Sequence, residues 1–216
     1  ARRLLTLENP AEGRLYGAIY AVNPVGTSEY NALMLSLQHR GTRGLFLSSN
    51  YTMSECVTDV INYEPGIAGI NLTKPGDVAF DRGSCGTTDQ RHVANMSVVY
   101  QIPGRDGGAL SALTRDWQVS AIVAARSGRH FDVQTGVDNA LNGQSGQRPN
   151  QISDDVYVKD GLRWLNPAAF QAPAPGTFGN LERNSLVGPR RFNMDMGVTR
   201  SFRFGGSQQV QFRGEV

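Results

Sequence analysis

The stretch RFNMDMGVTRSFRF (191–204) decides the fold, because apolar and polar side chains alternate along nearly its whole length. The apolar residues at every second position are Phe192, Met194, Met196, Val198 and Phe202. The positions between them carry polar residues or glycine, and Arg200 is the exception on the apolar side. A period of two is typical of a β-strand whose two faces meet different surroundings. The sequence therefore predicts a long strand with one apolar and one polar face.

The last segment of the chain, QVQFRGEV (209–216), alternates in the same way and predicts an antiparallel partner for this strand. Between the two segments lies Phe204-Gly205-Gly206-Ser207. Its glycines can adopt the positive φ angles that a tight hairpin turn requires. The two segments together therefore predict a β-hairpin.

Four earlier segments show the same alternation, and each predicts a further strand. They cover residues 28–40, 44–55, 91–102 and 116–127. The short turn Gly41-Thr42-Arg43 joins the first two. We expect one more strand around residues 14–22, where the two faces are less distinct.

The apolar residues are dispersed along the chain. They make up 39% of 216 residues, yet no uninterrupted apolar run is longer than five residues, as from Ala121 to Ala125. A membrane-spanning helix needs about 20 such residues, so a helical membrane protein is excluded. A strand of a membrane β-barrel needs only about 10 alternating residues, so this class of membrane protein fits the pattern.

The predicted connections alternate in length along the chain. The short or moderate ones cover residues 41–43, 103–115 and 204–207, and the long ones cover 56–90 and 128–190. Outer-membrane barrels have this asymmetry, with short periplasmic turns and long extracellular loops. Tyr100, Trp117 and Phe202 lie on the apolar face at the short-turn end, so we predict that they are membrane-interface aromatics.

A soluble antiparallel sandwich is the alternative, since apolar and polar residues also alternate along its strands and its loops lie at the ends of the sheets. Two observations favour the barrel. The strands predicted over 28–40, 44–55, 91–102 and 116–127 have 12 or 13 residues, against the usual five or six, and the polar faces carry mainly Arg, Gln, Asn and Ser. The expected fold is all-β, an antiparallel up-and-down transmembrane β-barrel segment of about six to eight strands.

Charge and motifs indicate no catalytic chemistry. The balance of 21 Lys and Arg against 19 Asp and Glu gives a net charge of +2, too small to indicate nucleic-acid binding. The chain contains no GxSxG, HExxH or P-loop motif, and no Cys and His spacing typical of zinc sites. We therefore expect no enzymatic activity, no metal and no cofactor.

Several stretches, in order, resemble one family. They are YNALMLSLQHR (30–40), RGLFLSSNYTMSEC (43–56), DRGSCGTTDQRHVANMSVVYQIP (81–103), DWQVSAIVAARSGRHFDV (116–133), GQRPN (146–150), WLNPAAF (164–170), GTFGNLERNSLVGPRRFNMDMGVTRSFRFG (176–205) and QVQFRGEV (209–216). The sequence resembles the C-terminal part of the barrel of TonB-dependent receptor-like outer-membrane proteins, specifically the Oar-like group.

This resemblance implies that residues 1–216 are part of one barrel domain in the bacterial outer membrane, cut at both ends. The plug domain and TonB box of the family are absent from the sequence. The expected partners are outer-membrane lipid, an unknown transported or bound ligand, and, through the missing N-terminal part, the plug and TonB.

The barrel topology predicts that polar strand residues line a lumen. The residues assigned to this role are Asn50, Asn95, Gln118, Arg126, Asp195, Arg203 and Arg213. The same topology places Cys56 and Cys85 at one extracellular loop, in an oxidising space. We expect a disulfide between them, the alternative being two free thiols.

Two functions follow from the resemblance and the loops. The first is substrate uptake, with the strands forming the wall of the pathway. The second is surface binding or adhesion through the long loops, without transport. Residues 128–190 include Phe131, Trp164, Phe170 and Phe178, which could bind sugars or peptides if exposed; the alternative is that they pack the loop onto itself.

Overall fold

The computed structural model describes residues 7–15, 25–42, 44–59, 72–104, 107, 114–204 and 208–216. The strand expected over residues 14–22 lies outside the described residues from Tyr16 onward. The turn glycines Gly205 and Gly206 also lie outside them, as does Arg43.

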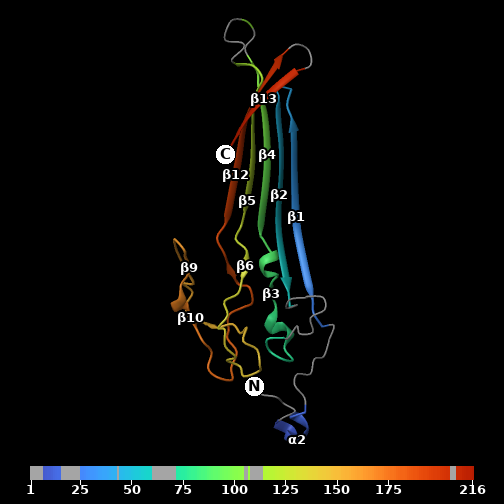
Figure 1. Cartoon of the computed structure of the whole chain (residues 1–216). Coiled ribbons are helices and arrows are strands. Elements are labelled where there is room, and N and C mark those ends of the chain that lie inside the picture. The colour runs from blue at the N-terminus through green and yellow to red at the C-terminus, as the bar shows by residue number, and fades with distance from the viewer. Residues whose placement is uncertain are drawn as a thin grey trace. The chain divides into compact units, whose positions relative to one another are not determined.

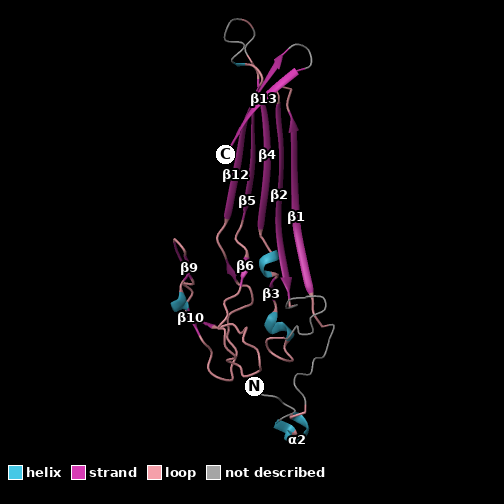
Figure 2. Ribbon diagram, in the orientation of Figure 1, coloured by secondary structure: helices cyan, strands magenta, loops and turns pink. Residues whose placement is uncertain are grey.

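Strands account for most of the regular structure (Figures 1 and 2). They are β1 (Ser28–Arg40), β2 (Leu45–Thr58), β3 (Gly83–Ser84), β4 (His92–Ile102), β5 (Trp117–Arg126), β6 (His130–Phe131), β7 (Asn150–Gln151), β8 (Tyr157–Asp160), β9 (Arg163–Leu165), β10 (Phe170–Gln171), β11 (Leu186–Val187), β12 (Arg191–Phe204) and β13 (Gln208–Glu215). The helical elements are α2 (Pro10–Gly13) and the 3-10 turns η1 (Val78–Asp81), η2 (Gly86–Thr88) and η3 (Pro167–Ala169). No helix within the described residues is long and apolar enough to cross a membrane.

The six long strands form one sheet in the order β1-β2-β4-β5-β12-β13, and the short β3 pairs with the end of β2. The pairs whose register is resolved are antiparallel. Strands adjacent in this order are also consecutive among the long strands of the chain, which is an up-and-down topology (Figure 1). The expected all-β, antiparallel fold is confirmed, and the six long strands in the described residues fall within the expected six to eight.

The register confirms that the sheet has two different faces. Residues directly opposite each other in an antiparallel pair point to the same side. One continuous row of such partners, on the apolar face, consists of Leu47, Val98, Ala121 and Met196. A row on the other face consists of Ser48, Ser97, Ile122 and Asp195. The second face is less uniformly polar than predicted, since Phe46, Val93 and Val99 also lie on it.

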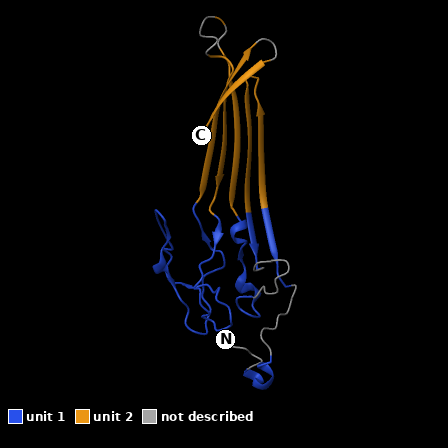
Figure 3. Ribbon diagram, in the orientation of Figure 1, with its two compact units in different colours: residues 1–31, 55–89, 129–189 blue, residues 32–54, 90–128, 190–216 orange. Residues whose placement is uncertain are grey.

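The chain divides into two compact units (Figure 3). The sheet unit contains residues 32–54, 90–128 and 190–216, and the loop unit contains 1–31, 55–89 and 129–189. In the described part of the chain, the buried hydrophobic residues all belong to the loop unit. Its core is built around Val156, Ala169, Leu181 and Leu186.

The sheet unit exposes its large apolar side chains. Phe192 and Phe212 on the apolar face are both 65% exposed. The four methionines on that face, Met53, Met96, Met194 and Met196, are exposed as well. Apolar residues arranged this way on one side of a sheet need an apolar environment, because contact with water is unfavourable.

Candidate functional site

The seven polar residues predicted to face a lumen lie on one face of the sheet. The register pairs Asn50 with Asn95, and it links Gln118 through Thr199 to Arg213. Arg126 lies eight positions from Gln118 on β5, and Asp195 and Arg203 each lie four positions from Thr199 on β12. Residues an even number of positions apart on a strand share a face, so these three lie on the same face as the other four. The structure therefore brings the predicted set together on a common face, and that this face borders a lumen stays a prediction.

Two recesses lie over the polar face. The larger has a volume of about 630 Å³ and is lined by residues that include Asp195, Gln118 and Arg213. The smaller has a volume of about 420 Å³ and includes Gln118 and Arg203. Amides and charges of both signs line these recesses, so the face can form hydrogen bonds to a polar solute or to another protein segment.

Some polar side chains on this face already have partners within the sheet. The Ser36 hydroxyl donates a hydrogen bond of 2.8 Å to Asn50 Oδ1. Arg213 and Glu215 form an ion pair along β13, with both side chains more than half exposed. An exposed pair of this kind contributes little to stability. Both charges therefore stay accessible at the surface of the sheet.

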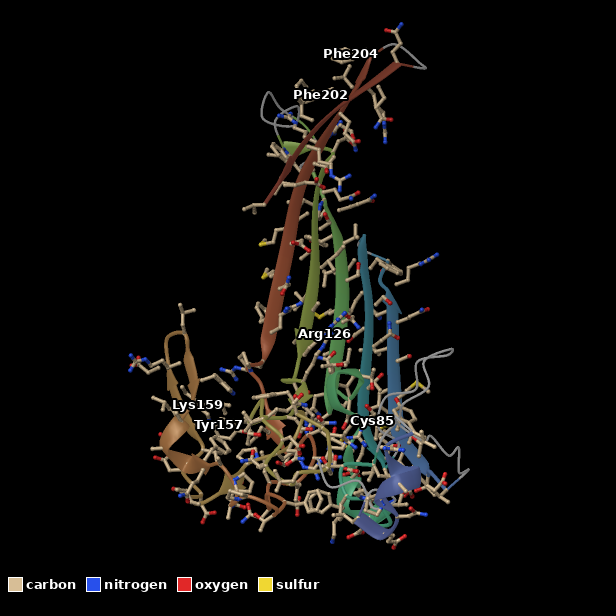
Figure 4. All side chains as sticks on the ribbon, turned by 60° about the horizontal axis from the view of Figure 1, so that its bottom comes forward. Cys85, Arg126, Tyr157, Lys159, Phe202 and Phe204 are labelled. Atoms are coloured by element: carbon tan, nitrogen blue, oxygen red, sulfur yellow. A yellow bond between two sulfur atoms is a disulfide. The ribbon has the colours of Figure 1, made fainter. Side chains whose placement is uncertain are left out.

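The three aromatics predicted at the membrane interface occupy one end of the apolar face. Trp117 is the cross-strand partner of both Ile102 and Arg200, and Tyr100 lies one row further along the face. The rings of Phe202 and Phe212 meet edge to face, with centroids 5.7 Å apart. Phe202 is labelled in Figure 4. The structure groups these aromatics, and their position at the membrane interface stays a prediction.

A second aromatic group lies at the opposite end of the apolar face and was not predicted. The Tyr51 ring stacks on His92, with centroids 6.1 Å apart and an interplanar angle of 14°. The Tyr51 hydroxyl and His92 Nδ1 form a hydrogen bond of 2.8 Å. Phe192 lies in the same row as Tyr51. The sequence carries a signal for this group, because Tyr51 and Phe192 lie in their alternating segments at the ends away from the short connections.

The spacing of the two aromatic groups matches the thickness of a membrane. On β12, Phe192 belongs to one group and Phe202 to the other, and the two residues are ten positions apart. At about 3.3 Å per residue this is roughly 33 Å along the strand. A strand tilted by about 40° would then cross roughly 25 Å, which is the height of the apolar band in outer-membrane barrels.

A buried ion pair holds the loop unit together. Arg148 Nη1 lies 2.9 Å from Asp81 Oδ1, and the two side chains are 4% and 0% exposed. Arg148 also donates to the carbonyl oxygens of Leu181 and Phe80. Asp81 accepts a further hydrogen bond from the Thr73 N–H. The pair joins three distant parts of the loop sequence, and its remaining polar atoms are satisfied, as burial of charge requires.

A second arginine and a second carboxylate lie in the same unit. Arg183 Nη1 donates to the carbonyl oxygens of Thr58 and Asp81. Asp132 accepts a hydrogen bond from the Asn184 N–H. Burial raises the pKa of the Asp132 carboxyl, and this hydrogen bond offsets only part of the effect. The long loops are therefore cross-linked by polar groups into an ordered structure.

The predicted disulfide is present. Cys56 and Cys85 are bonded with a Cα–Cα distance of 5.4 Å. Cys56 lies two residues before the end of β2, and the pairing of Val57 with Ser84 in β3 brings the two cysteines side by side. Cys85 is labelled in Figure 4. Closing a loop of this length stabilises a protein by about 3 to 4 kcal/mol in the chain-entropy model.

The loop aromatics pack within the loop unit. Phe131 and Phe170 cover its hydrophobic core, and Phe178 meets Phe80 edge to face. Trp164 packs on Tyr157, and its Nε1 donates to the carbonyl oxygen of Val187. The alternative in which these rings pack the loop onto itself is confirmed.

The hairpin β8–β9 presents a small cationic and aromatic surface. Lys159 and Tyr157 are labelled in Figure 4. Lys159 Nζ lies 5.2 Å from the Tyr157 ring centroid and 5.9 Å from that of Trp164. Leu162, at the turn, is fully exposed. Nearby in the sequence, a recess of about 460 Å³ is lined by Gln151, Ile152, Ser153, Asp154, Asn180, Glu182 and Ser185. The described residues contain no group of three or more His, Cys, Asp and Glu side chains that could hold a metal ion.

One comparison with known proteins gave a match. A family model described as an outer membrane beta barrel domain matches residues 2–216. No curated protein and no solved structure matches the chain.

Proposed function

Because the chain belongs to the outer membrane β-barrel domain family and so lies in the bacterial outer membrane, we propose that it forms part of the wall of a substrate-uptake pathway. The more specific form of the proposal is a TonB-dependent receptor. In such a receptor a plug domain fills the lumen, and TonB supplies the energy that moves it. The proposed role is not enzymatic and uses no cofactor.

The observation that carries this proposal is the common face of the seven polar residues. They lie opposite the apolar face, and two recesses lined by amides and charges lie among them. A wall of a polar pathway through lipid needs this division, with one side for hydrocarbon and the other for water, solute or plug.

Charge reversal on the polar face tests the uptake proposal. The double variant Arg203→Glu and Arg213→Glu should lower uptake of anionic solutes and raise that of cationic ones in cells that make the full protein. The matched control is Arg163→Glu in β9, which reverses a charge outside the wall and should leave both rates unchanged. Equal rates in all three proteins would contradict the proposal. Loss of uptake on collapse of the proton gradient would support the TonB-dependent form.

Surface binding is the second candidate, and the ordered loop unit favours it. The recess beside Asp154 and Glu182 offers carboxylates, amides and hydroxyls, groups that recognise the hydroxyls of sugars. The double variant Asp154→Ala and Glu182→Ala should then abolish capture of oligosaccharides by whole cells and leave uptake unchanged. Unchanged capture would remove this candidate.

A further inference from the structure

Arg200 is the one charged residue on the apolar face of β12. Along this strand the other residues on that face are Phe192, Met194, Met196, Val198, Phe202 and Phe204. A charge that faces lipid is least costly near the membrane interface, where the side chain can reach the headgroups. Arg200 lies at the end of the face that carries Trp117 and Phe202, which is where an interface is expected.

Two aromatic rings hold the guanidinium of Arg200. Its Cζ lies 5.1 Å from the ring centroid of Trp117 and 4.3 Å from that of Phe202. Cation–π contacts of this length are attractive and favour a defined position of the charge over the rings. The cation is therefore kept among the aromatics at this end of the face.

A recess of about 490 Å³ adjoins this cation. It is lined by Trp117, Val198, Arg200, Phe202, Phe212, Arg213 and Gly214. Gly214 pairs with Val198 across the hairpin, and a Cβ at Gly214 would meet no atom within 4 Å. The missing side chain leaves open space beside the charge, bordered by apolar groups.

We propose that this recess binds a membrane phospholipid, with the lipid phosphate on Arg200 and an acyl chain along Val198 and Gly214. A guanidinium matches phosphate because its planar fork donates two parallel hydrogen bonds. Aromatic rings at the interface suit the boundary between headgroup and acyl chain. The short connections at this end of the sheet assign the site to the periplasmic leaflet. The inference depends on location in the outer membrane and not on uptake.

The test is native mass spectrometry of the full protein extracted from outer membranes in mild detergent. The protein should retain one phospholipid. Arg200→Gln should lower the retained fraction about fivefold, as expected for loss of one basic residue at a membrane surface. Arg200→Lys, which keeps the charge without the fork, should give an intermediate value. Arg203→Gln removes the same charge three residues further along β12, on the opposite face, and should leave retention unchanged.

A second variant tests the recess without touching the charge. Gly214→Leu fills the open space and should reduce lipid retention while Arg200 remains. Heat-modifiable migration on gels shows whether each variant folds. If Arg200→Gln does not fold, Gly214→Leu still tests the proposal. Retention by Arg200→Gln or by Gly214→Leu equal to that of the unaltered protein would overturn the proposal. So would a retained lipid with the mass of lipid A, which belongs to the opposite leaflet.

Discussion

The pair of Asp81 and Arg148 shows how single residues order the loop unit. The two are 67 positions apart in the sequence, and both are buried. Burial of an ion pair gives little net stability by itself, whereas removal of one partner leaves an uncompensated charge. The contribution of this pair is therefore best measured by breaking it.

We expect Asp81→Asn to destabilise the loop unit by about 3 to 5 kcal/mol, because Arg148 would remain buried without its counter-ion. The measurement is limited proteolysis of the loops in the full chain, with the denaturant dependence of cleavage. Asp77→Asn is the control, since Asp77 pairs with Lys74 at the exposed surface of the same unit. If both variants are cleaved like the original chain, the buried pair does not order the loops.

The raised pKa of Asp132 fixes the sign of one effect of pH on stability. Burial raises its pKa above the ordinary value near 3.8, so the native chain holds this proton more tightly than the unfolded chain. The protonated carboxyl therefore stabilises the native chain at low pH. This stabilisation is lost as the pH rises from the ordinary pKa through the raised pKa of the native chain. Asp132→Asn should leave stability at neutral pH equal or higher, and should remove this loss. Thermal unfolding of the loop unit as a function of pH measures both effects.

Asp59 provides the comparison of opposite sign. The Thr27 hydroxyl and N–H hydrogen-bond its carboxylate and lower its pKa. Its stabilisation is present above the ordinary pKa and is lost as the pH falls through the lowered native value. Asp59→Asn should therefore reduce stability at neutral pH. The same response from both variants would contradict the assignment for Asp132.

At the scale of the element, β12 carries the difference between the two faces most clearly. Met196 lies in the middle of its apolar face, between the two aromatic groups. Met196→Arg should cost about 2 to 4 kcal/mol in lipid, the cost of arginine near the bilayer centre in outer-membrane barrels. The measurement is urea unfolding of the full protein in lipid vesicles.

Asn193→Arg is the matched control for this substitution. Asn193 lies on the polar face of the same strand, so the added charge would remain in polar surroundings. Its stability should stay close to that of the original protein. Equal destabilisation by both substitutions would mean that the apolar face of β12 does not meet lipid.

At the scale of the whole molecule, the long strands could be predicted from the sequence because their pattern is local. The strand expected over residues 28–40 has the same bounds as β1, and that expected over 44–55 differs from β2 by one residue at its start and three at its end. The common face of the polar residues also followed, since alternation fixes the side of each residue.

The interior of the loop unit could not be predicted. It depends on pairs such as Arg148 with Asp81 and Arg183 with Thr58, which are 67 and 125 positions apart and follow no local period. The extension of β2 to Thr58 has the same origin, since it pairs there with β3. The cysteines were assigned correctly because barrel topology brought them to one loop, although the pairing of β2 with β3 that aligns them was not foreseen.

The exposed methionines of the sheet have a consequence for oxidative damage. Met53, Met96, Met194 and Met196 lie on the apolar face, and Met96 and Met194 are both partners of Val123. A thioether oxidised to the sulfoxide becomes polar, which would place an unfavourable group against hydrocarbon. If the apolar face meets lipid, hydrocarbon that excludes peroxide and water would protect these thioethers, and a sheet held outside the membrane would lose apolar surface as they oxidise.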